Sequence, residues 1–162
     1  MTCLGITGHR NLGRATTDLI AAELRGLFGS LALAEGESLT GVTCLAEGAD
    51  ALFAQLVLDY GGALEAIIPA ADYRDRLHIS YQAVYDGFLF RARKVHRLDH
   101  IRSDPESYMA ASRLMLSTID ELIAVWDGLP AVGYGGTADV VAEARSLDIP
   151  VRVVWPEGSV RG

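Results

Sequence analysis

The stretch Cys3–Arg10, with the sequence CLGITGHR, joins an apolar run to a glycine and two basic side chains. Residues Cys3–Thr7 form the short apolar run, which is typical of a buried strand. Gly8 then allows the backbone to turn sharply and to approach a ligand closely. We therefore expect the first strand of an α/β fold here, ending in a polar turn.

Five further apolar runs follow, and segments with apolar residues at helical spacing separate them. The last two runs contain IAVW and VRVVW, whose apolar residues on both faces favour a parallel sheet covered by helices on both sides. The predicted strands are Cys3–Thr7, Gly41–Cys44, Leu64–Ile68, Val95–Leu98, Glu121–Trp126 and Val151–Trp155. The predicted helices are Thr16–Gly29, Ala49–Tyr60, Asp72–Arg93 with an irregular start, Asp104–Ile119 and Thr137–Leu147, and residues 31–39 are expected to be a linker.

This alternation predicts an α/β fold with three layers, in which a Rossmann-like, doubly wound, mainly parallel sheet of about six strands lies between helices. The 162 residues fit one domain, 1–162. A hydrophobic content of 50% and a charged content of 22% exclude a disordered chain. The two cysteines, Cys3 and Cys44, lie in apolar runs and are expected to be buried thiols.

The charge and the hydropathy pattern predict the partners and the location of the protein. The formal net charge is −7, which argues against nucleic acid as a partner because such binding depends on neutralising phosphates. No apolar run approaches the roughly 20 residues of a membrane-spanning helix, so no membrane partner is expected. The N-terminus enters a strand without a basic region or a cleavage site, which predicts a cytoplasmic location.

Ligands of open parallel sheets bind beyond the carboxyl ends of the strands, and three glycine-bearing turns are predicted at such ends. A phosphorylated, nucleotide-like ligand is therefore expected there. Each turn also has a purely structural explanation, as a polar surface turn or as acids that complement a helix dipole. The turns are Gly8–Arg10 after the first strand, Glu47–Asp50 after the second and Gly133–Thr137 after the fifth.

The side chains in these turns suggest separate roles. His9 and Arg10 would donate hydrogen bonds to phosphate, and Glu47 would accept from ribose hydroxyls. Free N–H groups at a helix start favour anions. Tyr73, after the third strand, would stack on a base. The predicted binding residues are Gly8, His9, Arg10, Glu47, Gly48, Asp50, Tyr73, Gly133, Gly135, Gly136 and Thr137.

Other site patterns are missing or weak. The first turn is neither a Gly-x-Gly-x-x-Gly fingerprint nor a P-loop. No Gly-x-Ser-x-Gly elbow supports a hydrolase triad. His96 and His100 have the spacing of metal ligands, but His96 lies in a predicted strand. The sequence therefore predicts neither a metal site nor a bound cofactor.

Taken in order, the segments Gly8-His9-Arg10, Glu47-Gly48-Ala49-Asp50 and Gly135-Gly136-Thr137 resemble the SLOG superfamily, and the resemblance covers nearly the whole chain. Members of this superfamily include the Lonely Guy-type phosphoribohydrolases and the DprA-like and YpsA-like proteins. The resemblance implies a Rossmann-like fold that binds nucleotides or nucleotide-derived ligands.

The catalytic motifs of the resembling enzymes carry over only in part. Their motif Pro-Gly-Gly-x-Gly-Thr-x-x-Glu corresponds to Val132–Val140, in which the proline is missing and the catalytic glutamate falls on Val140. Asp139 is one residue away, a rotation of roughly 100° about a helix. Arg113 corresponds to the enzymes' arginine. The resemblance therefore implies Arg113 as a catalytic candidate, with Glu47 or Asp139 as its carboxylate.

Three functions follow from these observations. The first is binding of a nucleotide or a nucleotide-derived phosphorylated ligand, as in a sensor or carrier, and Val140 favours it over catalysis. The second is a phosphoribohydrolase that cleaves the N-glycosidic bond of a nucleoside 5′-monophosphate, which requires a carboxylate near an oxocarbenium-like transition state. The third is a structural or interaction protein without a ligand. A homodimer or higher homo-oligomer is also expected, with the helix Glu106–Ile119 as a candidate interface.

Overall fold

The structure is a computed structural model that describes residues 1–31 and 37–162. Most of the linker predicted for residues 31–39 lies outside the described residues. Within the described residues, no helix combines the length and apolarity that crossing a membrane requires.

The six strands form one sheet in which every neighbouring pair is parallel, so the predicted doubly wound α/β fold is confirmed. The strand order is β4-β3-β2-β1-β5-β6. The chain first builds outward from β1 on one side and then returns to its other side, so β1 and β5 flank the switch point. The strands are β1 (Thr2–Gly8), β2 (Leu39–Thr43), β3 (Ala63–Ile68), β4 (Lys94–Arg97), β5 (Glu121–Val125) and β6 (Val151–Val154).

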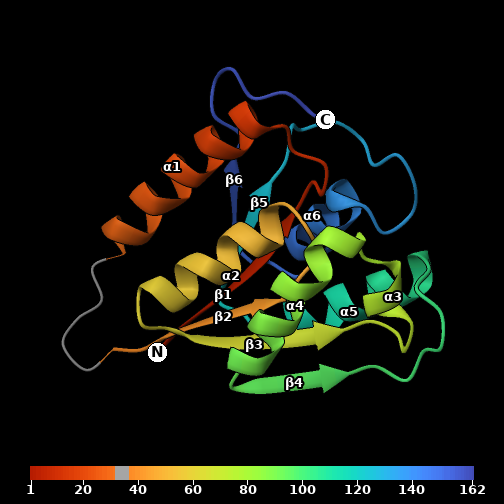
Figure 1. The fold of residues 1–162 in the computed structure, drawn as a ribbon. Helices are drawn as coiled ribbons and strands as arrows, with labels where there is room; N and C mark the ends of the chain where they lie inside the picture. The colour runs from red at the N-terminus through yellow and green to blue at the C-terminus, as the bar shows by residue number, and fades with distance from the viewer. Residues whose placement is uncertain (32–36) are drawn as a thin grey trace.

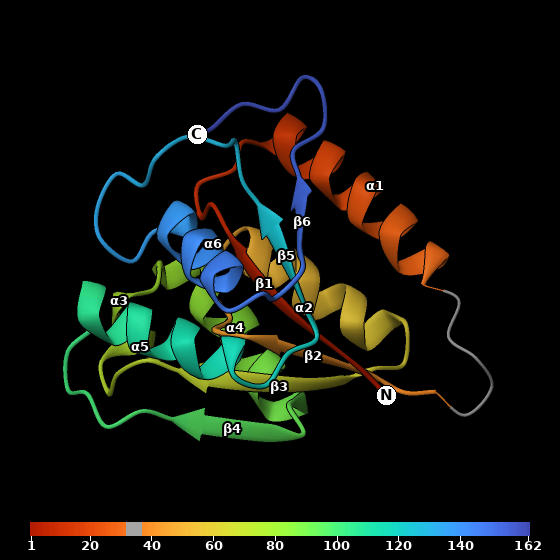
Figure 2. The same ribbon diagram turned by 180° about the vertical axis from the view of Figure 1, so that it is seen from behind.

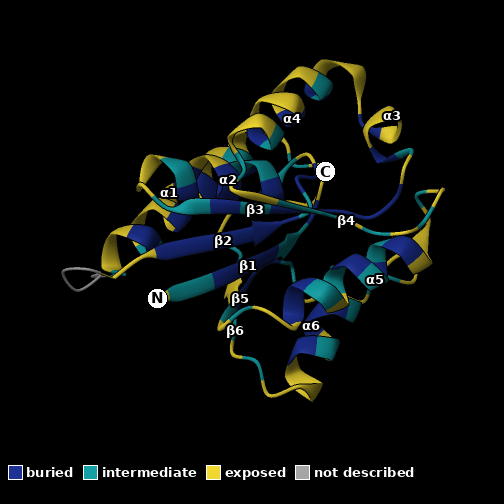
Figure 3. Ribbon diagram, turned by 90° about the horizontal axis from the view of Figure 1, so that it is seen from below, coloured by how far each residue is buried: buried dark blue, intermediate teal, exposed yellow. Residues whose placement is uncertain are grey.

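Helices cover both faces of the sheet (Figure 1). One face carries α1 (Arg14–Ser30), α2 (Ala49–Asp59) and α4 (Ile79–Arg91). The opposite face carries α5 (Pro105–Leu116) and α6 (Thr137–Ser146), which lie in front of the sheet in Figure 2. Figure 3 shows the sheet from its edge, with α1, α2 and α4 on one side of it and α5 and α6 on the other.

The helix predicted for Asp72–Arg93 is two helices. The short α3 (Tyr73–Arg76) ends before Leu77, which has extended backbone angles. His78 then caps α4, because its side chain accepts a hydrogen bond from the Ser80 N–H. This break fits the irregular start expected from the sequence.

The core consists of two clusters, one on each face of the sheet. The larger cluster joins α1, α2 and α4 to the sheet, with Leu24, Phe28 and Phe53 among its buried residues. The smaller cluster lies under α5 and α6 and includes Met109 and Met115. The apolar face of α5 therefore packs against the sheet, and the predicted homo-oligomer stays a prediction.

Candidate functional site

A cavity of about 600 Å³ lies at the carboxyl end of β1, at the switch point of the sheet. This volume is within the range of small-molecule sites. Segments far apart in the sequence line it, including the predicted turns after β1 and β5. Its walls come from residues 6–11, from Cys44, Ala46 and Asp50, from Pro69 and Tyr73, from Pro105, Tyr108, Ser112 and Met115 on α5, from residues 131–137 and Val140, and from Arg161 and Gly162.

Two glycines let the turns after β1 and β2 approach each other closely. A Cβ on Gly8 would lie 2.6 Å from the Ala49 Cβ, so glycine is required where α2 begins beside β1. Gly48 has a φ of +89°, and a Cβ there would lie 2.4 Å from the Arg10 carbonyl oxygen. At both positions a side chain would collide with the neighbouring turn, so only glycine lets the two turns lie this close. Gly8 also lines the cavity, whereas Gly48 does not.

His9 is buried and connects the turn after β1 to its neighbours. Its Nε2 accepts a hydrogen bond from the Asp127 N–H at 3.3 Å, and its ring packs edge-to-face on Trp155. Burial lowers the pKa of His9, and the charge of Arg161 lowers it further. A neutral, packed imidazole of this kind positions the turn.

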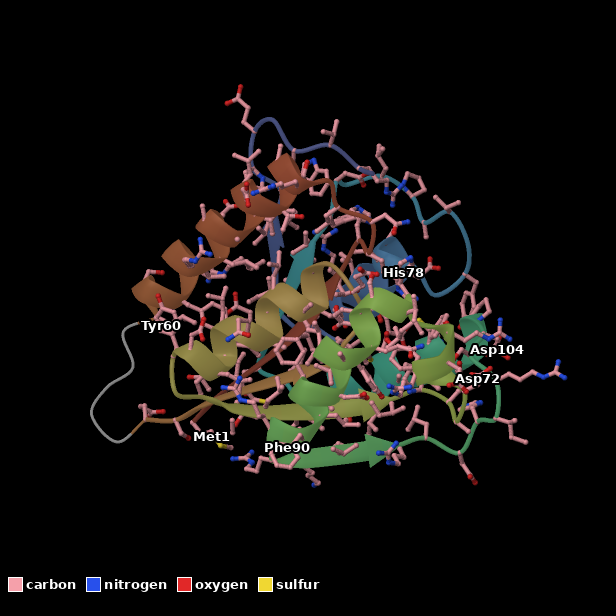
Figure 4. All side chains as sticks on the ribbon, in the orientation of Figure 1. Met1, Tyr60, Asp72, His78, Phe90 and Asp104 are labelled. Carbon is pink, nitrogen blue, oxygen red and sulfur yellow. The ribbon has the colours of Figure 1, made fainter. Side chains whose placement is uncertain are left out.

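Arg10 is exposed toward the cavity, and its guanidinium lies 4.8 Å from the centre of the Tyr108 ring. This cation–π contact holds the charge beside α5. The start of α5 is itself well fixed, because Asp104 and Ser107 form a reciprocal capping box with Pro105 in the first turn. Asp104 and Asp72 lie close together at this end of the molecule (Figure 4), and Ser103 donates two hydrogen bonds to Asp72.

Asp50 is a buried carboxylate in the first turn of α2, with 7% of its surface exposed. The Ala46 N–H donates to its Oδ2 at 3.2 Å. In the loop before Asp50, Leu45 has an unusual φ of +57°. The Tyr81 hydroxyl donates a hydrogen bond to the Leu45 carbonyl oxygen. Burial raises the pKa of Asp50 to about 6, against the opposing effects of the Ala46 hydrogen bond and the charge of Arg10.

The glycine-rich loop after β5 forms another wall of the cavity. Gly135 has a φ of +85°, and its N–H donates to Asp139 Oδ2 at 2.8 Å. Gly136, with extended backbone angles, is the N-cap of α6, so Thr137 is the first helical residue. The first turn of α6 therefore lies at the cavity wall, where its N–H groups favour anions.

Several predicted residues lie outside the cavity wall. Glu47 is exposed and is not among the lining residues. Arg113 forms an ion pair with Glu143 and donates to the Tyr134 hydroxyl. Asp139 is also not among the lining residues, and its carboxylate accepts a hydrogen bond from the Gly135 N–H. Val140 does line the cavity, as a buried apolar side chain at the position of the glutamate of the resembling enzymes.

The sequence missed Arg161, in the C-terminal tail. Its guanidinium contacts Asp127 at 3.4 Å and the His9 ring at 3.3 Å, and it lines the cavity. Leu12 and Arg161 form an antiparallel bridge, so the tail lies beside the turn after β1 in both Figure 1 and Figure 2. No motif surrounds this arginine, and only the folded chain brings it to the site.

The fold and its cavity define a Rossmann-like α/β protein with a ligand-sized site at the switch point. Solved structures with this fold include DNA processing protein A (DprA) from Streptococcus pneumoniae, with a TM-score of 0.64 at 18% identity over 94% of this chain and 50% of that one. DprA from Helicobacter pylori gives a TM-score of 0.68 at 15% identity, over 98% of this chain and 67% of that one. The resemblance to a superfamily that includes DprA-like proteins is therefore confirmed at the level of the fold.

A structural-genomics target designated TM1055 also shares the fold, with a TM-score of 0.58 at 15% identity over 93% of this chain and 72% of that one. The present chain spans half the length of the Streptococcus pneumoniae protein. No protein-family model matches the chain, and no curated sequence matches it significantly.

The prediction that nucleic acid is excluded as a partner is wrong. The Helicobacter pylori DprA structure, which shares this fold, is described as showing a single-stranded DNA binding mode. The prediction relied on the net charge of −7, whereas the binding of a phosphate depends on the cations near it. Arg10 is such a local cation at the cavity, and Arg161 lies on the same wall in an ion pair with Asp127.

Proposed function

We propose that this protein binds a nucleotide or a nucleotide-derived phosphorylated ligand in the cavity at the end of β1. The observation that carries the proposal is Arg10. It lines the cavity, is held over the Tyr108 ring, and forms no ion pair with any carboxylate of the described residues. A positioned guanidinium without a carboxylate partner favours a phosphate ligand.

The remaining walls support the same ligand class. The first turn of α6 offers backbone N–H groups, which bind phosphates in many α/β proteins, whereas the N–H groups of Gly135 and Gly136 in the preceding loop already donate to Asp139 and to the Gly133 carbonyl oxygen. Ile6, Met115 and Val140 add apolar surface that suits the faces of a nucleobase.

We propose binding rather than hydrolysis as the function. The apolar Val140 stands where the resembling enzymes have their glutamate. The neighbouring Asp139 carboxylate already accepts a hydrogen bond from the Gly135 N–H. Incubating the protein with nucleoside monophosphates and measuring free base by chromatography checks this point. Release of base above the uncatalysed rate would favour the phosphoribohydrolase instead.

A thermal-shift screen tests the proposed binding. Nucleoside monophosphates, ADP-ribose and NAD would each be added at millimolar concentration. A ligand that binds only the folded state raises the melting temperature, because it adds RT ln(1 + [L]/Kd) to the free energy of unfolding. If none of these compounds raises the melting temperature, the proposal fails.

Arg10→Ala should abolish the shift produced by any ligand found in this screen. The matched control is Arg91→Ala, which removes an exposed arginine at the end of α4, away from the cavity. The control should keep the full shift. Retention of the shift in the Arg10 variant would mean that the ligand binds elsewhere.

Single-stranded DNA is a second candidate ligand, and the DprA comparison favours it. A short oligonucleotide would place one phosphate at Arg10 and stack a base near Tyr108. Fluorescence anisotropy with a labelled strand of about ten nucleotides tests this candidate. Competition by unlabelled mononucleotide would indicate that both ligands use the same cavity.

A further inference from the structure

Tyr73 carries a buried hydroxyl that has no hydrogen-bond partner within the described residues. The residue is only 1% exposed, and its ring packs against Tyr85 and Tyr108. A buried hydroxyl without a partner is rare and destabilises the folded state. Because Tyr73 also lines the cavity, its unpaired hydroxyl is available to a ligand that binds there.

The hydroxyl of Tyr73 lies near charged and polar groups that line the same cavity. Burial raises the pKa of Tyr73 well above its usual value, and the groups that act on it through their charge include Cys44, Arg10 and Asp50. All four residues belong to the cavity wall. Tyr73 therefore contributes a hydrogen-bond donor to the same cavity wall as the Asp50 carboxylate, which accepts hydrogen bonds when ionised.

A sugar hydroxyl satisfies both groups at once, because it accepts one hydrogen bond and donates another. A phosphate does not, since its charge would lie near that of Asp50. Asp50 also follows β2, and in doubly wound folds an acid near the end of the second strand binds the ribose 2′-hydroxyl. The sequence assigned this role to Glu47, which lies outside the cavity wall.

We propose that Tyr73 and Asp50 together bind the 2′-hydroxyl of the ligand's ribose, so that the site selects ribonucleotides over 2′-deoxyribonucleotides. This inference rests on the proposed nucleotide binding. It makes Tyr73 a specificity-determining residue through its hydroxyl, whereas the sequence suggested base stacking through its ring.

The experiment compares base-matched pairs by isothermal titration calorimetry. Each of the four common ribonucleoside 5′-monophosphates is titrated alongside its 2′-deoxy counterpart. We expect the deoxy ligand to bind at least about tenfold more weakly for every base that binds, because it leaves the buried Tyr73 hydroxyl without a partner and makes no hydrogen bond to Asp50. In Tyr73→Phe this ratio should fall several-fold. The matched control is Tyr85→Phe, which alters a buried tyrosine outside the cavity wall and should keep the ratio.

The melting temperature of the unliganded protein gives an independent readout. Tyr73→Phe removes an unsatisfied hydroxyl and should raise the melting temperature by about 2–4 °C, while weakening ribonucleotide binding. A lower melting temperature would mean that the hydroxyl is already bonded, for example to a buried water, and would overturn the proposal.

The outcomes separate the two proposals. If no monophosphate of either sugar binds, the proposed function fails and this inference fails with it. If ribo and deoxy ligands bind equally well, or if affinity follows the base alone, nucleotide binding stands and only the ribose selection is overturned. Tighter binding of the deoxy ligands would favour DNA.

Discussion

At the scale of single residues, the ionisation of Asp50 couples to the stability of the fold because its carboxyl group is buried. Burial raises its pKa to about 6 from the usual 3.8. Between these two values the unfolded chain is ionised while the folded protein holds a proton. The free energy of unfolding therefore falls as the pH rises from about 4 to 6.

Asp50→Asn removes this pH dependence. The variant should gain up to about 3 kcal/mol relative to the wild type between pH 4 and pH 7, as expected for a shift of about two pKa units. Urea unfolding at pH 4, 5, 6 and 7 measures the difference. Asp59→Asn, an exposed change on the same helix, is the control and should show a constant difference. A constant difference for Asp50→Asn as well would contradict the assigned shift.

Gly48 sets the distance between the turns after β1 and β2. Gly48→Ala would place a Cβ against the Arg10 carbonyl oxygen at a φ of +89°, and we expect a loss of about 2 kcal/mol or more in stability. Gly26→Ala is the control, because its Cβ would meet no atom within 4 Å inside α1. That change should stabilise the protein by up to about 1 kcal/mol. Chemical denaturation of both variants tests the pair, and equal effects would argue against the close approach.

At the scale of elements, α5 is a capped helix that also forms part of the cavity wall. Its first turn is held by the capping box at Asp104 and Ser107, and Tyr108 follows one residue later. Sequence signals predicted this start well, because an acid followed by proline is a local pattern. The break between α3 and α4 was less predictable, since it depends on the His78 side chain reaching Ser80.

Asp104→Ala should lower the stability by about 1 kcal/mol through loss of the cap. Because α5 carries the Tyr108 platform for Arg10, the same change should also weaken binding of any ligand found in the thermal-shift screen. Denaturation and calorimetry on one preparation measure both effects. Asp18→Ala, an exposed acid within α1, serves as the control and should change neither by a comparable amount. Unaltered affinity in the Asp104 variant would separate the cap from the site.

At the scale of the whole molecule, the net charge is −7, yet Arg10 and Arg161 both line one cavity. A single strand of DNA that binds through Arg10 and Arg161 alone should lose affinity only gently with salt. The slope of log K against log salt concentration should be about −1 to −2, given roughly −0.7 per phosphate neutralised. Titrations at several salt concentrations give the slope. A slope of −4 or steeper would require a further basic surface outside the cavity.

The sequence by itself determined the sheet, its six strands and the helices between them. These features follow from apolar periodicity and from local signals such as Asp104-Pro105. It also placed all three predicted turns at the cavity, the second of them through Asp50 alone, because the carboxyl ends of parallel strands meet at one edge.

Only the tertiary structure decided which side chains reach the cavity. Glu47 and Asp50 are three residues apart, yet burial at the start of α2 brings one into the wall and leaves the other exposed. Tyr108 and Arg161 join Arg10 from distant parts of the chain, and no local pattern records such contacts. Local spacing predicts elements, whereas the packing of elements against one another selects the residues of the site.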